Sequence, residues 1–259
     1  MSETRDPSPA ITRGLRILDV LERAAGNPQT LSDIARAVGI AKSSASNICA
    51  ALEAERMIQR VDSGYRLGMR TAELGGSFAL QFNQVREFFT VVEADPQLSE
   101  HVVQIATRDE VDAIYLARHE GRRHRLGTPL GSRLPLVYCA VGTAMLLREP
   151  EDQIAPLLRQ DALRPPTSRS SRDAGVISAR IRRAREVGYA VDRGESIEGV
   201  HGVAAPLEPW RPGDPPMAIG VALSTDEADD ATIERIGAAV LRIATRLTNP
   251  LARRPEATA

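Results

Sequence analysis

Apolar residues recur at helical spacing through the first part of the chain and then at alternating spacing. A stripe of leucines predicts a helix over 12–25, and similar stripes predict helices over 31–38 and 42–55. Residues 57–67 alternate between apolar and polar around Asp62-Ser63-Gly64, a pattern typical of a hairpin. Three helices and a hairpin so close together predict a compact first unit.

The pattern changes after residue 101. Residues 70–82 and 84–94 predict two connecting helices, and beyond them short apolar runs predict strands that mix with helices. The absence of a regular βαβ alternation favours an α+β fold with a mixed or antiparallel sheet. The predicted strands are 102–106, 113–116, 123–127, 189–193, 199–207 and 216–224, with a loop over 127–135, and the predicted helices are 138–147, 150–159, 173–187 and 229–247.

These elements predict a two-domain organisation. We expect a disordered arm over 1–10, a first domain over 11–69, linker helices over 70–95, a second domain over 96–249 and a disordered tail over 250–259.

Composition narrows the possible functions. The net charge of -1 excludes a wholly basic, histone-like protein. Two cysteines make neither a disulfide framework nor a zinc site, so we predict no metal and no cofactor. No apolar run is long enough to span a membrane and the first ten residues lack a signal-peptide core, which favours a cytoplasmic protein without a membrane partner.

A helix-turn-helix motif is the strongest candidate for function. Ala35 stands where two helices cross and Gly39 where the chain turns with positive φ. Between 11 and 70 there are nine basic and six acidic residues, a local charge of +3 that favours nucleic acid. The second helix begins with small polar residues that fit a DNA groove, and the hairpin adds two arginines. The candidate DNA contacts are Lys42, Ser43, Ser44, Ser46, Asn47, Arg60 and Arg66.

The ordered motifs resemble those of the IclR-type bacterial transcriptional regulators. The matching segments are RGLRILDVLE, LSDIARAVGIAKSSASNICAALEAERMI and GYRLGMRTAELG, then LPLVYCAVGTAML, REVGYAVDRGESIEGVHGVAAPLEP and MAIGVALS. The resemblance covers about residues 11–248. It implies a winged helix-turn-helix domain, a linker helix and a GAF-like effector-binding domain. It also implies dimers, or dimers of dimers, that bind pseudo-palindromic operator DNA and control catabolic or metabolic genes, with repression expected over activation.

The resemblance also places an effector pocket. Its residues are Tyr138, Cys139, Ala140, Val141, Asp192, Gly202, Gly220 and Ala222. The family often has Lys at Thr143, Cys at Gly202, and Ser where this chain has Gly220 and Ala222. We expect the small residues to add volume, and the effector to be a carboxylic acid with an apolar body, such as a hydroxybenzoate-like acid. Asp192 is then expected to accept a hydrogen bond from a hydroxyl or amine of the effector.

Two other classes of function stay open at this point. Cys139 begins a predicted helix, where the helix dipole lowers a thiol pKa, and a Cys-dependent hydrolase is the rival hypothesis. A ligand-binding protein that has lost DNA binding is the other. His119, His124 and His201 lack the spacing of a metal site.

We also expect part of an apolar surface to form a dimer contact. The residues of this surface are Leu15, Leu18, Leu74, Phe78 and Phe82.

Overall fold

The computed structural model describes residues 6–123 and 126–249. The chain divides after Gln81 into two compact units. The predicted tail over 250–259 and the first half of the predicted arm lie outside the described residues. Within the described part, the first helix begins at Pro9, inside the segment expected to be disordered, because a proline in the first helical turn costs no hydrogen bond.

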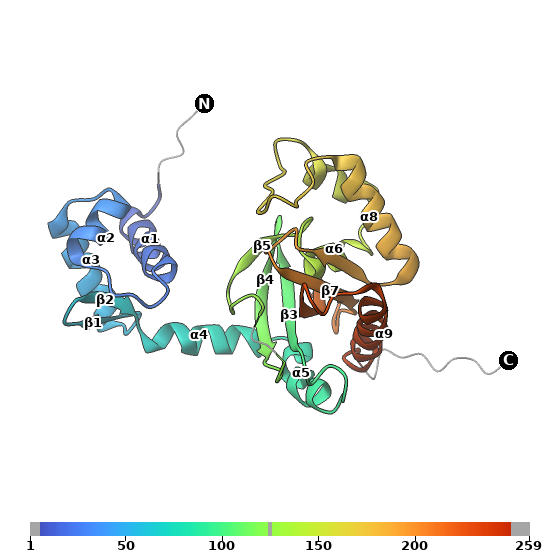
Figure 1. Ribbon diagram of the computed structural model, residues 1–259. Coiled ribbons are helices and arrows are strands. Elements are labelled where there is room, and N and C mark those ends of the chain that lie inside the picture. Colours follow the sequence, from blue (N-terminus) through green and yellow to red (C-terminus); the bar gives the residue numbers. More distant parts are fainter. Residues whose placement is uncertain (1–5, 124–125, 250–259) are drawn as a thin grey trace. The chain divides into compact units, whose positions relative to one another are not determined.

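Over its described residues, 6–81, the first unit contains four helices and a two-stranded hairpin (Figure 1). Its core is made by buried side chains from every element except the last helix: Ile17, Leu21, Ile34, Cys49, Ile58 and Tyr65. The elements are α1 (Pro9–Arg23), α2 (Leu31–Val38), α3 (Lys42–Ala54), β1 (Ile58–Val61), β2 (Gly64–Leu67) and α4 (Met69–Ala79).

The turn between α2 and α3 has the predicted geometry. Thr30 caps α2 by accepting a hydrogen bond from the Asp33 backbone N–H at 3.2 Å. Gly39 ends α2 with φ +72°, a left-handed conformation that favours glycine. Ala35 is buried behind this turn, so the small side chain allows α2 and α3 to pack closely. The sequence prediction of a helix-turn-helix is confirmed.

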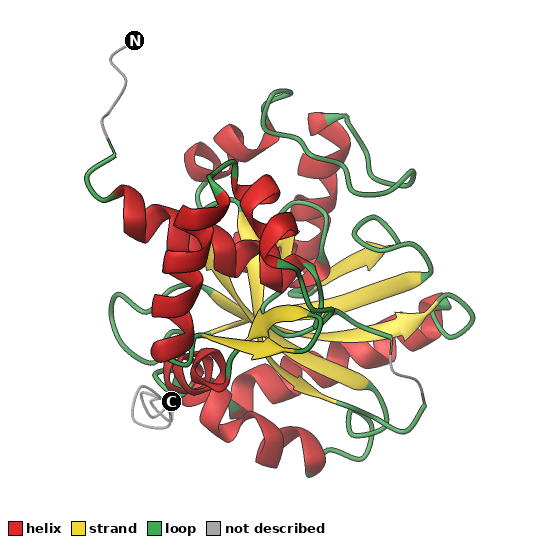
Figure 2. Cartoon of the chain, turned by 90° about the vertical axis from the view of Figure 1, so that its left-hand side faces the viewer, coloured by secondary structure: helices red, strands yellow, loops and turns green. Residues whose placement is uncertain are grey.

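The second unit is built on a six-stranded sheet in the order β5-β4-β3-β8-β7-β6. All five strand pairs are antiparallel. Helices α6 and α8 cover one face, and α5 and α9 cover the other (Figures 1 and 2). The strands are β3 (Val102–Asp109), β4 (Asp112–His119), β5 (Arg133–Pro135), β6 (Ala190–Arg193), β7 (Val200–Leu207) and β8 (Met217–Ser224). The helices are α5 (Asn83–Glu93), α6 (Ala140–Leu146), α7 (Glu151–Ile154), the 3-10 helix η1 (Ala155–Leu158), α8 (Ala174–Val187) and α9 (Asp230–Arg246).

Two predictions about local structure were wrong. The edge strand beside β4 is β5, which lies in the segment expected to be a loop. Of the predicted strand over 123–127, residues 124–125 lie outside the described part and the others belong to no strand. The predicted helix over 150–159 is split into α7 and η1. Pro156 has no N–H to continue an α-helix, and this causes the break.

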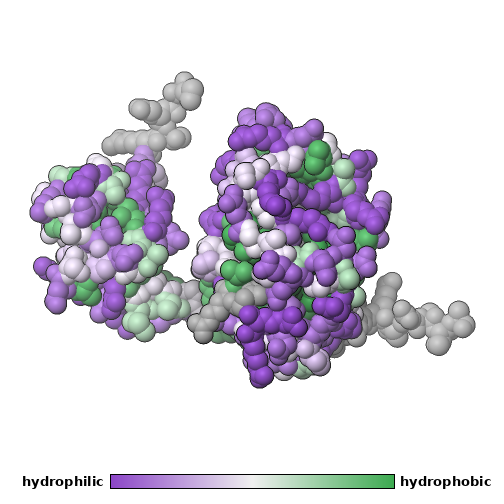
Figure 3. Space-filling model, in the orientation of Figure 1, coloured by the Kyte–Doolittle hydropathy of each residue, from purple (hydrophilic) through white to green (hydrophobic). Residues whose placement is uncertain are grey.

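No helix in the described part of the chain is long and apolar enough to cross a membrane. The visible face of the second unit is mostly hydrophilic, with small apolar areas between (Figure 3).

Candidate DNA-binding face and effector cavity

Helix α3 has one buried face and one exposed polar face. Ala45 and Cys49 point into the core of the first unit. Lys42, Ser43, Ser46 and Asn47 are exposed, and Ser44 is half-buried at the edge of that face. The spacing of the four exposed residues places them together on successive turns of the helix. The structure therefore brings the α3 candidates to one surface, with Ser44 less accessible than the others.

The hairpin register separates the two candidate arginines. Arg66 pairs with Gln59, and Arg60 pairs with Tyr65. Directly paired residues of two antiparallel strands lie on the same face, and successive residues alternate between faces. Arg66 is therefore on the outer face, where its Nη2 donates to Gln59 Oε1 at 3.3 Å. Arg60 is on the face that carries the buried Tyr65, with its guanidinium carbon 5.9 Å from the centre of that ring. The two arginines do not share a surface of the hairpin.

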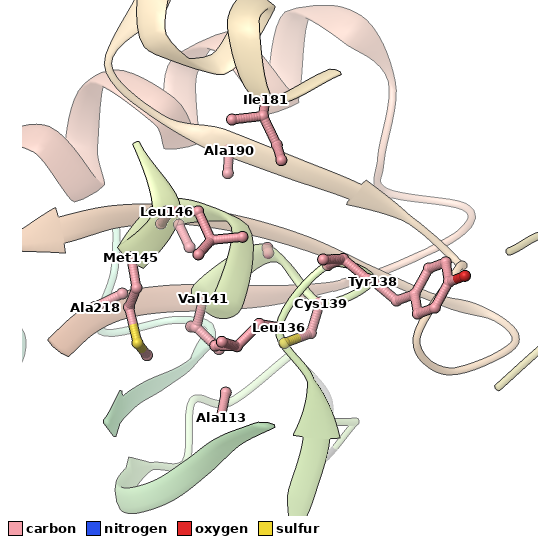
Figure 4. Close-up of a cluster of buried hydrophobic side chains, with 14 of the residues drawn as sticks. Ala113, Leu136, Tyr138, Cys139, Val141, Met145, Leu146, Ile181, Ala190 and Ala218 are labelled. Carbon is pink, nitrogen blue, oxygen red and sulfur yellow. The ribbon is translucent and has the colours of Figure 1, made fainter. Parts of the chain in front are cut away.

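The second unit has a small cavity between the start of α6 and the sheet. Its volume is about 40 Å³. Of the eight residues that the sequence placed in the effector pocket, seven line it: Cys139, Ala140, Val141, Asp192, Gly202, Gly220 and Ala222. Tyr138 does not. Its ring extends away from Val141, and its hydroxyl donates to the Ser171 carbonyl at 2.8 Å (Figure 4).

Sequence reasoning missed several polar residues of the cavity. Gln104, Tyr115, Thr128 and Ser196 also line it. Gln104 is buried, and its amide accepts a hydrogen bond from the Thr128 N–H at 3.2 Å while donating to the Thr128 carbonyl. A polar residue in the otherwise apolar run Val102–Ala106 was the available signal. The sequence gives no such signal for Thr128, because only tertiary packing brings this residue next to Gln104 on β3.

The expectation that glycines enlarge the pocket was wrong. A Cβ atom at Gly202 would stand 2.8 Å from the Ala140 Cβ. A Cβ atom at Gly220 would stand 2.7 Å from Val141 Cγ1. The first turn of α6 therefore occupies the space that the missing side chains leave. The cavity is far smaller than the roughly 300–1,000 Å³ of typical ligand pockets.

Asp192 is the acidic group of the cavity wall. Burial raises its pKa to about 6, although hydrogen bonds from Ser196 and the nearby Arg180 charge act in the opposite direction. One carboxylate oxygen accepts from the Glu195 N–H at 2.7 Å, and the other accepts from the Ser196 hydroxyl. Asp192 therefore fixes the loop that follows β6 as well as facing the cavity.

Cys139 does not have the environment of a nucleophile. The residue is 1% exposed. Burial raises the pKa of its thiol to about 12, outweighing the Gly142 N–H, which lowers it. The prediction that the helix dipole lowers this pKa was wrong, because removal from water dominates at a fully enclosed sulfur. At neutral pH the thiol is protonated, which argues against the hydrolase hypothesis.

These features define a helix-turn-helix DNA-binding protein with a separate small-molecule-binding domain. Residues 10–62 match the IclR helix-turn-helix domain, and residues 86–249 match the C-terminal domain of the bacterial transcriptional regulator IclR. The chain belongs to the IclR family of bacterial transcriptional regulators. Members of this family are DNA-binding regulators and not enzymes.

Individual relatives agree with this assignment. The chain is 27% identical to the HTH-type transcriptional repressor AllR of Salmonella typhi over 202 residues, covering 76% of this chain and 74% of that protein. Two solved structures share the fold. An IclR transcriptional regulator from Alicyclobacillus acidocaldarius has a TM-score of 0.80 at 21% identity, over 94% of this chain and 98% of that one. An IclR homologue from Microbacterium hydrocarbonoxydans, complexed with 4-hydroxybenzoate, has a TM-score of 0.76 at 22% identity, over 92% of this chain and 98% of that homologue.

Proposed function

We propose that the protein is a cytoplasmic repressor of catabolic or metabolic genes whose binding to operator DNA responds to a small carboxylic acid. The acid occupies the cavity beside α6. Two observations carry this proposal: the first unit has an exposed polar helix start, and the second has a small cavity lined by polar as well as apolar residues. The name of the AllR relative supports repression.

The DNA contacts follow from the exposed face of α3. Lys42, Ser43, Ser46 and Asn47 enter the major groove, with Ser44 at the margin of the contact. A lysine at a helix start suits a phosphate, and an asparagine suits an adenine edge. Arg66 lies outward on the wing and approaches the adjacent backbone. Arg60 contributes mainly through its position over Tyr65.

The effector class follows from the size and chemistry of the cavity. The N–H groups at the start of α6 suit a carboxylate, and Asp192 accepts a hydrogen bond from a hydroxyl or amine of the ligand. A volume of about 40 Å³ favours an acid of few atoms. An aromatic acid, such as the 4-hydroxybenzoate held by the Microbacterium homologue, fits only if the cavity walls separate.

Assembly is part of the proposal. A pseudo-palindromic operator needs two DNA-binding units at a spacing of about 34–36 Å per helical turn. An apolar groove between α1 and α3 is lined by residues such as Leu15, Leu18 and Ile48. Ile11 is 66% and Leu15 58% exposed. This surface forms a homodimer contact, and a dimer of dimers extends it on DNA. Leu74 and Phe78 are also exposed, whereas Phe82 is buried within the second unit.

The test joins operator binding to ligand binding. Footprinting of the purified protein on genomic DNA gives the operator. A thermal-shift panel of glyoxylate, pyruvate and benzoate derivatives follows, in which an acid at 100 times its Kd stabilises the protein by about 2.7 kcal/mol. The active acid should then change operator affinity in a gel-shift assay. A protein that protects no DNA, or whose DNA binding ignores every stabilising acid, would contradict the proposal.

A further inference from the structure

Two chain segments form opposite walls of the cavity. One is 136–141, which leads into α6, and the other is 192–200, which joins β6 to β7. Arg180 of α8 bridges them from behind. Its guanidinium donates to the Val137 carbonyl and forms an ion pair with the Glu195 carboxylate. Only 21% of the Arg180 side chain and 12% of the Glu195 side chain are exposed, so solvent screens this pair little.

A second bridge joins the same two walls. The segment 164–172, here called the strap, runs from the region after η1 to the start of α8. The Thr167 hydroxyl hydrogen-bonds to the carbonyls of Gly194 at 3.0 Å and Glu195 at 3.1 Å. The Ser170 hydroxyl donates to the Glu195 carbonyl at 2.6 Å. On the other side, the strap carbonyl of Ser171 accepts the Tyr138 hydroxyl.

Both bridges hold the two walls together. The start of α6 already touches the sheet at Gly202, and the thiol of Cys139 is almost fully enclosed. A carboxylic acid larger than a few atoms therefore cannot enter unless the wall at 192–200 moves away from the wall at 136–141. Such movement must break at least one contact in each bridge, because Arg180 contacts both walls, and the strap is bound to one wall through Thr167 and Ser170 and to the other through Ser171.

We propose that the strap hydroxyls of Thr167 and Ser170, together with the Arg180–Glu195 ion pair, form a latch that governs ligand access to the cavity. Thr167 and Ser170 are positioning residues, since they act on the ligand through the loop that Asp192 anchors. The inference rests on the proposed function only in taking the cavity to be the effector site. The latch itself is a property of the second unit and is testable without DNA or effector.

The chemistry of the latch suits reversible opening. A neutral hydrogen bond in a protein contributes little net free energy, equivalent to a roughly three- to tenfold change in an opening equilibrium. A buried ion pair resists opening more strongly.

Cys139 is a natural reporter of opening. Its high pKa and burial prevent alkylation while the walls are closed, so the labelling rate measures the open fraction. The full-length protein is treated with iodoacetamide, and mass spectrometry of peptides gives the rates at Cys139 and Cys49 separately. We expect Thr167→Val and Ser170→Ala each to raise the Cys139 rate about threefold to tenfold. We expect Glu195→Gln to raise it roughly tenfold or more.

Matched variants separate the latch from general loosening. Thr167→Ser keeps the hydroxyl and should restore the wild-type rate. Ser171→Ala alters the same strap, but the Ser171 hydroxyl accepts from the Asp173 N–H, which lies outside both walls, so the rate should not change. Labelling at Cys49, in the other unit, should stay constant in every variant, and thermal melting checks the fold.

Two results would overturn the latch. One is wild-type labelling of Cys139 in Thr167→Val and Ser170→Ala when both melt like the wild type. The other is labelling of wild-type Cys139 as fast as a cysteine in the denatured chain. Failure of the effector proposal has a different signature: no acid of the panel stabilises the protein or slows Cys139 labelling, while the strap variants still accelerate it.

Discussion

Gly202 on β7 lies directly beneath Ala140 of α6, and a Cβ atom at position 202 would approach the Ala140 Cβ to 2.8 Å. The helix start and the sheet are thus in contact through this glycine. Gly202→Ala should lower the free energy of unfolding of the second unit by about 1–3 kcal/mol, since a well-packed core adapts poorly to an added carbon. Chemical denaturation measures it. Gly75→Ala is the control. No neighbouring atom lies within 4 Å of the Cβ that it would add, so the free energy of unfolding of the first unit should be unchanged or slightly raised. Equal stability of Gly202→Ala and wild type would mean that α6 can move freely away from the sheet.

Lys42 and Asn47 should affect operator binding in different ways. Lys42→Ala removes a phosphate contact, so affinity should fall for all DNA sequences and the salt slope should decrease by about one. Asn47→Ala should relax preference at one base pair by roughly 1–3 kcal/mol. Gel-shift titrations at several salt concentrations, on operator and on single-base variants, distinguish the two. Wild-type binding by both variants would show that α3 does not read the groove.

The two arginines of the hairpin should contribute differently to DNA affinity. Arg66→Ala removes an exposed charge from the outer face, so it should weaken binding to every DNA sequence and reduce the salt slope. Arg60→Ala should change affinity less and instead lower the stability of the first unit slightly, because it loses the stacking on Tyr65. The measurement is a salt-dependent binding titration paired with thermal melting. A larger loss of affinity in Arg60→Ala than in Arg66→Ala would contradict the assignment of faces.

Leu15 should be needed for self-association. Leu15→Asp places a charge in the apolar groove without touching the core of the first unit, since the side chain is 58% exposed. We expect light scattering to show a dimer or tetramer for the wild type at micromolar concentration and a smaller species for the variant. Leu126→Asp, at an exposed leucine of the second unit (41%), is the comparison and should leave the mass unchanged. A monomeric wild type, with and without DNA, would remove the proposed contact.

Asp192 should make the stability of the second unit depend on pH. Its pKa is raised to about 6 from an ordinary value of 3.8, so the folded state favours the protonated carboxyl. The protonated Asp192 carboxyl therefore adds up to about 3 kcal/mol to the relative stability of the folded state. This stabilisation is fully present below about pH 4 and is lost as the pH rises through about 6. Asp192→Asn stays neutral and lacks this loss. Denaturation curves at pH 4 to 8 should therefore show the wild type losing stability relative to Asp192→Asn, and parallel curves would refute the assignment.

Much of this architecture could be predicted from local sequence. The helix-turn-helix depends on short-range chemistry: Thr30 caps α2 and Gly39 takes the left-handed turn, and both signals lie within a few residues of the structure they cause. Strand β8 follows from an apolar run that is buried along almost its whole length.

What the sequence by itself determined is therefore the two-unit α+β plan, the polar start of α3 and seven of the residues that line the cavity. Only the tertiary structure decided the size of that cavity, because Gly202 and Gly220 can either open space or admit a neighbour, and α6 takes the space. The tertiary structure also decided that the Cys139 thiol stays protonated, because burial raises its pKa by more than the N–H groups at the helix start lower it. The separation of Arg60 from Arg66 depends on strand register, and the closure by Thr167 and Ser170 depends on contacts across more than twenty residues of chain. Such distances carry no periodic signal, and only packing brings these groups together.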